Sequence, residues 1–218
     1  MINGPLLPKI LIFSATVFLT NLMQLLFNTS DLVVVGRFAG NDALGAVGAT
    51  GALTTLFVNL FIGFSVGVSV VCTHCYGSGD MKGFRETVTT SVSLSAICGT
   101  ILAVGGFFLS RRMLELMDTP ESLLTMAADY LKIYFLCMPA LMFFNYGAAI
   151  LRSIGNTKTP MIILGVSGLT NVVLNLVFVI VFKLGVIGVA LATTVTQYQS
   201  AVMLIIHMKR SDSAYKIE

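Results

Sequence analysis

Charged residues are scarce in this chain of 218 residues. Asp, Glu, Lys and Arg together make up 11% of the sequence, whereas 56% of it is apolar and the mean hydropathy is +0.91. A domain dissolved in water needs a far more polar surface than this composition provides. The scarcity of charge therefore excludes a water-soluble domain and indicates a chain that lies in a lipid bilayer.

Motifs for catalysis are missing as well. The sequence has no P-loop, no nucleophile elbow and no paired catalytic carboxylates, so ATP hydrolysis and covalent catalysis have no evident residues. Of the four cysteines, Cys72 and Cys75 form a CTHC motif, but no second Cys/His pair at zinc spacing accompanies it. The net charge of +3 does not suggest a nucleic-acid partner. We therefore expect no enzyme, no Cys/His metal centre and no organic cofactor.

Long apolar runs dominate what is present. A hydrocarbon core about 30 Å thick takes about 20 apolar helical residues to cross, whereas barrel strands are shorter and alternate in polarity. Six windows of sufficient length occur, at about residues 10–36, 44–76, 87–110, 131–151, 160–182 and 184–208. The sequence therefore predicts an all-α polytopic membrane protein, a six-transmembrane-helix bundle over 1–208 with a hydrophilic C-terminal tail at 209–218.

The basic residues favour one orientation in the membrane. With the N-terminus inside, eight Lys and Arg residues fall on the inner side and five on the outer side, where the pair Arg111 and Arg112 runs against the trend. The positive-inside rule then predicts that both termini are cytoplasmic. The first window is too long for a cleaved signal peptide, so we expect it to be the first helix.

Asp31 interrupts the first window. Asn21, Gln24, Asn28 and Asp31 follow one another at steps of three and four residues, which places them on one face of a helix. A polar stripe in lipid has to face protein or a water-filled cavity, and an intramembrane carboxylate is a candidate for carrying an ion or a proton. The alternative is that Asp31 marks the outer interface, about 33 Å along the helix from Lys9.

Two later windows carry polar residues at helical spacing. In the fifth window, Ser167, Asn171 and Asn175 recur every four residues. In the sixth window, the polar face consists of Thr193, Thr196 or Gln197, and Ser200. These residues are expected either to complete a cavity with Asp31 or only to form hydrogen bonds between helices, which contribute about 0.6 kcal/mol each on average.

Pro139 lies inside the fourth window and is expected to kink that helix, because proline removes a backbone hydrogen bond. Around it, Met138, Met142, Phe143 and Phe144 offer an adaptable lining for bulky apolar substrates, or else serve as ordinary core and lipid-facing residues. The residues expected to line a substrate cavity are Gln24, Met138, Met142 and Asn145.

Several motifs together resemble one transporter family. They are N-x-x-D-x-x-x-V-G around Asp31, then A-L-G-A-V-G-A, I-L-R-S-I-G-N-T-K-T-P, N-V-V-L-N, and G-V-I-G-V-A-L-A-T. In these motifs the chain resembles the N-terminal six-helix half of multidrug and toxic compound extrusion (MATE) transporters, and the resemblance covers nearly the whole sequence. Complete members of that family have two such halves, so the resemblance implies a second six-helix lobe as partner, either another copy or a separate C-terminal half.

The resemblance also implies an ion site. Many bacterial and archaeal relatives use an aspartate at the position of Asp31, an asparagine at Asn171 and a threonine at Thr193. They carry a second aspartate where this chain has Asn175, which can coordinate a cation but cannot release a proton. The expected ion-coupling residues are Asn28, Asp31, Asn171, Asn175 and Thr193, with H⁺ or Na⁺ as the coupling ion and Na⁺ at Asp31 as the only expected metal.

The expected function is that of half a secondary active multidrug efflux antiporter in the plasma membrane. It exports amphiphilic, cationic compounds in exchange for H⁺ or Na⁺, with membrane lipid and a drug-like substrate as its other partners. The alternatives are a lipid-linked oligosaccharide flippase of the same superfamily and an inactive truncated fragment. Such flippases hold phosphates with basic residues in a central cavity, and the six windows carry Lys and Arg only near their ends.

Overall fold

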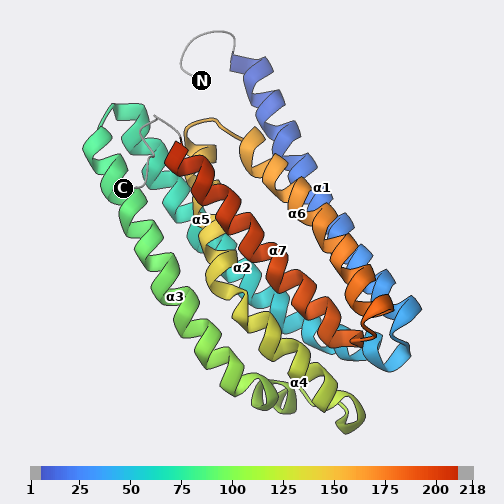
Figure 1. The fold of residues 1–218 in the computed structure, drawn as a ribbon. Coiled ribbons are helices and arrows are strands. Elements are labelled where there is room, and N and C mark those ends of the chain that lie inside the picture. The colour runs from blue at the N-terminus through green and yellow to red at the C-terminus, as the bar shows by residue number, and fades with distance from the viewer. Residues whose placement is uncertain (1–5, 211–218) are drawn as a thin grey trace.

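The structure is a computed structural model that describes residues 6–210. Helices make up all of its regular structure, and no strand occurs in the described range, so the predicted all-α fold is confirmed (Figure 1). The elements are α1 (Leu6–Phe38), α2 (Asn41–Ser78), α3 (Met81–Leu116), α4 (Glu121–Leu136), α5 (Met138–Ser153), α6 (Lys158–Leu176), the π-helical turn η1 (Val177–Val181) and α7 (Gly185–Arg210).

Five spans are each long and apolar enough to cross a membrane, and α4 with α5 forms a sixth as a bent pair. The two helices of this pair meet at Cys137 with an angle of 48°. The expected fourth helix at 131–151 is corrected at its start, because the span begins at Glu121, whereas the bend at Cys137, two residues before Pro139, confirms the expected kink. Asp129 and Lys132 do not interrupt the helix, because their half-buried side chains form an ion pair of 3.0 Å.

The turn between α2 and α3 extends both helices beyond the apolar windows. Gly79 ends α2 in the left-handed conformation, with φ of 78°, which glycine adopts without steric cost. Asp80 then begins α3, where its carboxylate accepts a hydrogen bond of 3.0 Å from the N–H of Gly83. At the other end of the chain, α7 includes Lys209 and Arg210, so the expected tail at 209–218 starts later. Residues 211–218 lie outside the described range.

The helices pack as an elongated bundle. In Figure 1, α1 and α6 lie side by side at one edge and α3 lies at the opposite edge, with α2, α4, α5 and α7 between them. The chain of α1 begins and that of α7 ends at the same end of the bundle, as six crossings require. Large apolar side chains such as Phe18 and Phe108 are exposed on the outer surface, where a multi-pass membrane protein meets lipid.

The break between α4 and α5 is built into the core. Gly99 of α3 lies so close to Pro139 that a Cβ on this glycine would be 2.6 Å from the proline Cα. From the other side, the Thr194 hydroxyl donates to the Ile133 carbonyl (3.2 Å) and the Tyr198 hydroxyl donates to the Leu136 carbonyl (3.0 Å). Side chains of α7 thus satisfy carbonyl groups at the break.

Candidate ion site

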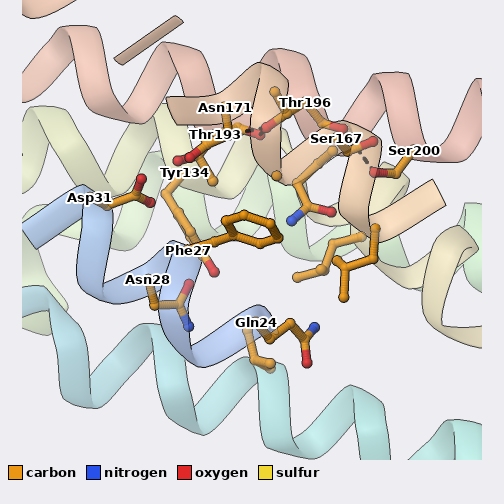
Figure 2. Close-up of a pocket in the computed structure, with 15 residues that line it drawn as sticks. Gln24, Phe27, Asn28, Asp31, Tyr134, Ser167, Asn171, Thr193, Thr196 and Ser200 are labelled. Atoms are coloured by element: carbon orange, nitrogen blue, oxygen red, sulfur yellow. Dashed lines mark hydrogen bonds between the residues drawn. The ribbon is translucent and has the colours of Figure 1, made fainter. Parts of the chain in front are cut away.

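A cavity of about 120 Å³ lies between α1, α6 and α7, with α4 closing one side (Figure 2). In Figure 2, Asp31, Asn28 and Gln24 reach it from α1, opposite the polar side chains of α6 and α7. A water molecule needs roughly 10–15 Å³ of such volume, whereas drug-sized ligands occupy pockets of roughly 300–1,000 Å³. The cavity therefore fits a small ion with several waters and is too small for a drug.

Asp31 belongs to a hydrogen-bond network that joins three helices. The side-chain amide of Asn175 donates to the carboxylate of Asp31 and also to Oδ1 of Asn171, the latter at 3.1 Å. Asn171 in turn donates to the hydroxyl of Thr196 at 3.4 Å, and this hydroxyl donates to carbonyl groups of its own helix. Asn175 thus donates both of its amide hydrogens, one to Asp31 and one to Asn171.

Three buried oxygen atoms next to this network have no hydrogen-bond partner in the described structure: Asn175 Oδ1, Thr193 Oγ1 and Ser167 Oγ. Leaving a buried polar atom unpaired costs about 1–3 kcal/mol, so native proteins keep few of them. Hard cations such as Na⁺ bind oxygen atoms of carboxylates, amides and hydroxyls. The donor set of one carboxylate and several unpaired neutral oxygens therefore suits a monovalent cation.

The charge of Asp31 has no basic partner within residues 6–210. The ion pairs in that range are Arg111 with Glu115 and Lys132 with Asp129. The cavity lining contains no Lys or Arg among the described residues. A carboxylate in a nonpolar membrane interior is costly unless a cation or a proton neutralises it. Among the described residues, the carboxylate of Asp31 therefore has only neutral polar groups around it.

The structure brings most of the sequence-predicted polar residues together. Gln24, Asn28, Asp31, Ser167, Asn171, Thr193, Thr196, Gln197 and Ser200 all line the cavity. Asn175 lies directly behind the lining, fully buried and bonded to Asp31. Asn21, although part of the expected stripe, is exposed and does not line the cavity.

Three predicted substrate-cavity residues lie elsewhere. Met138 and Met142 are fully buried in an apolar cluster with Phe61 and Phe135, so the alternative interpretation as core residues is the one the structure supports. The amide of Asn145 is buried as well and donates to the Leu141 carbonyl of its own helix at 2.9 Å. None of the three lines the cavity around Asp31.

Six residues of the cavity lining were not predicted from the sequence: Phe27, Val58, Tyr134, Leu141, Leu164 and Gly168. Tyr134 belongs to α4 and stacks on Tyr130, with ring centroids 6.0 Å apart. The available signal was the spacing of four residues between Tyr134, inside the fourth apolar window, and Tyr130, directly before it. Phe27 and Gly168 offered no such signal, because a phenylalanine and a glycine are common in any membrane helix.

Comparisons with known proteins agree with this architecture. The MatE family model matches residues 17–177. The chain is 29% identical over 195 residues to the "Probable multidrug resistance protein YpnP" of Bacillus subtilis (strain 168), covering 89% of this chain and 44% of that protein. It is 27% identical to the "Probable multidrug resistance protein NorM" of Thermotoga maritima, over 84% of this chain and 40% of that protein.

Solved structures show the same fold. The outward-facing conformation of a multidrug resistance MATE family transporter of the MOP superfamily superposes with a TM-score of 0.90 and 23% identity, over 96% of this chain and 47% of that one. The crystal structure of a MATE protein in the bent conformation gives a TM-score of 0.89 and 24% identity, again over 96% and 47%. The chain thus spans about half the length of the relatives it matches.

Proposed function

Because this chain belongs to the MatE family, we propose that it forms one lobe of a secondary active multidrug efflux antiporter. In this proposal, H⁺ or Na⁺ binds at Asp31 from outside the cell and drives the export of amphiphilic, cationic compounds. The membrane is the plasma membrane, with both ends of the described bundle on the cytoplasmic side.

The observation that carries the proposal is the position of Asp31. Its carboxylate lies inside the bundle without a basic partner in the described structure, is bonded to Asn175, and is close to oxygen atoms that lack hydrogen bonds. A site built only for structural hydrogen bonding would leave fewer acceptors unpaired. Binding of a cation supplies the missing partner and cancels the negative charge at the same time.

Ion binding changes the contacts of α1. In the structure, the carboxylate of Asp31 accepts a hydrogen bond from Asn175, which joins α1 to α6. A proton or Na⁺ on the carboxylate weakens its attraction for the amide and draws the unpaired oxygens of Asn175 and Thr193 toward the site. Since the loaded and empty states have different contacts, the ion shifts the equilibrium between two arrangements of α1.

The drug itself has its place outside this cavity. A volume of about 120 Å³ holds an ion and water but no drug-sized molecule. Alternating access generally needs two bodies that move against each other around a shared site. We therefore place the substrate between this lobe and a second six-helix lobe, either another copy of the chain or a C-terminal half.

The flippase alternative is less favoured. Lipid-linked oligosaccharides carry phosphates, which proteins hold with Arg and Lys. In the described residues, the cavity lining offers one carboxylate and neutral polar groups instead. An inactive fragment is the outcome in which the assembled protein neither binds the ion at Asp31 nor transports.

Reconstitution tests the proposal. The chain, alone and together with its partner lobe, is placed in liposomes loaded with a fluorescent cationic dye, and efflux is followed under an imposed Na⁺ or proton gradient. Dye export that depends on one gradient and is lost in Asp31→Asn is the expected result. Export that is indifferent to both gradients overturns antiport, and export of a lipid-linked sugar instead of the dye supports the flippase.

A further inference from the structure

Helix α1 is attached to the bundle mainly through α6. It is the least buried of the five long spans, and its other contacts within the lobe are few. At the centre of this attachment, the ring of Phe27 lies directly on the backbone of Gly168. A Cβ placed on Gly168 would be 1.9 Å from Cε2 and 2.2 Å from Cζ of Phe27.

That contact leaves no room for a side chain at position 168. Real Cβ atoms are essentially never closer than 3.0 Å to another heavy atom. A methyl group at this position therefore has to push the ring away, and a rigid aromatic ring transmits the displacement to its helix. At Gly165, by contrast, an added Cβ would be 3.0 Å from the flexible end of Met23, which moves aside more easily.

The contact is also aligned with the ion site along both helices. Asp31 follows Phe27 by four residues, which is about one turn of α1. On α6, Asn171 and Asn175 follow Gly168 by three and seven residues, about one and two turns. The spacing of the two helices at Phe27 therefore determines how far the carboxylate of Asp31 reaches toward the amide of Asn175.

We propose that Gly168 is a positioning residue of the ion site: by admitting the ring of Phe27, it holds α1 close enough to α6 for Asp31 and Asn175 to share one cation. The inference rests on the proposed function, since it takes Asp31 as the ion-binding group. Gly168 itself has no side-chain ligand to offer, so its proposed role is to set the spacing of the two helices.

Ion binding is measured directly rather than through efflux. The first readout is binding of radioactive ²²Na⁺ to the purified full chain. The second is the infrared carboxyl band of Asp31, identified by its absence in Asp31→Asn and recorded across a pH series. Tyr130 and Tyr134 of α4 are titratable groups that interact electrostatically with Asp31. Both tyrosines are unchanged in every variant tested.

Four proteins are compared: the wild type, Gly168→Ala, the double variant Gly168→Ala/Phe27→Leu, and Gly51→Ala. The last is a matched control, because Gly51 also lies inside a transmembrane helix and a Cβ there meets nothing within 4 Å. Both single variants add the same methyl group and the same helix propensity. The methyl group of Gly168→Ala meets the ring of Phe27 at the edge of the cavity, whereas that of Gly51→Ala meets nothing, and the double variant keeps the methyl group but removes the clash with the ring.

Gly168→Ala is expected to weaken Na⁺ binding by about 10- to 100-fold, the usual effect of misplacing a ligand. If the coupling ion is H⁺, the midpoint of the pH titration of the Asp31 band should shift by the equivalent amount. Gly51→Ala is expected to bind like the wild type. The double variant should recover most of the loss, because the smaller leucine leaves space for the methyl group. Thermal unfolding and gel filtration of Gly168→Ala check that the single variant is folded, and recovery in the double variant then assigns the loss to the clash with Phe27.

Wild-type ion binding in Gly168→Ala overturns the inference, and so does a loss that the double variant fails to repair. These outcomes differ from failure of the proposed function. If the wild type itself neither binds ²²Na⁺ nor shows a titrating Asp31 band, the ion site is rejected as a whole. If the wild type responds and Gly168→Ala responds identically, only the positioning role is rejected.

Discussion

Asn175 donates a side-chain hydrogen bond to the carboxylate of Asp31, which lies 144 residues earlier in the sequence. The bond joins α1, the helix least embedded in the lobe, to α6, which is packed against α7. Through this bond, the hydrogen-bond network of three helices also reaches the carboxylate of Asp31. A change of charge at this bond therefore acts on the helix with the fewest other contacts.

Replacing Asp31 with Asn should abolish ion-driven efflux in the complete assembly and leave the protein folded. Asparagine has nearly the same shape and still accepts a hydrogen bond from Asn175, but it carries no charge to neutralise. Dye efflux under ion gradients and thermal unfolding in detergent measure the two properties. Asp42→Asn, at the exposed start of α2, is the control and should transport normally. Full coupled transport by Asp31→Asn would refute the role of this carboxylate.

Replacing Asn175 with Asp should change the ion dependence of binding or transport without preventing membrane insertion. Two carboxylates in contact are not both ionised unless a cation lies between them, so the variant site should hold one additional H⁺ or Na⁺. Ion stoichiometry and the pH and Na⁺ profiles are the measurements.

The swapped variant Asp31→Asn/Asn175→Asp is the control for that experiment. It keeps one carboxylate but moves it from α1 to α6, and it separates the number of charges from their location. An ion profile of Asn175→Asp identical to that of the wild type would place residue 175 outside the site.

Removing the hydroxyl of Tyr198 should destabilise the bundle by about 0.5–1.5 kcal/mol, the usual net contribution of a hydrogen bond. In Tyr198→Phe, the carbonyl of Leu136 loses the partner that α7 provides at the break between α4 and α5. Reversible unfolding in mixed micelles gives the free energy. Tyr76→Phe is the matched control, because the ring of Tyr76 packs on Phe84 and its hydroxyl makes no hydrogen bond in the described structure. Equal stabilities of the two variants would show that the break does not depend on Tyr198.

The six-span lobe should fold alone, whereas efflux should require a second lobe in parallel orientation. Hydrogen bonds inside the lobe already satisfy much of the polar network, so a folded monomer costs little. Transport additionally needs an opposite wall for the substrate path. Crosslinking and mass measurement in mild detergent, combined with efflux from proteoliposomes, test both statements. Robust efflux by a demonstrated monomer would contradict the second.

The sequence alone determined the class of the fold, because scarce charge and long apolar runs leave only membrane-spanning helices as a stable arrangement. It also determined which face of three helices is polar, since helical spacing follows directly from residue order. Gln24, Asn28 and Asp31 on α1 and Ser167 and Asn171 on α6 were grouped correctly for this reason.

Helical spacing did not decide which of these faces meet; the family resemblance implied one site, and the tertiary structure supplied its contacts. It brought Asn175 against Asp31, moved Met138 and Met142 from the expected cavity into the core, and added Tyr134 from α4. It also showed that Gly168 receives the ring of Phe27. Contacts of this kind depend on how helices far apart in the chain are rotated and spaced relative to one another. The packing of whole helix surfaces sets this rotation and spacing, and helical periodicity carries no information about them.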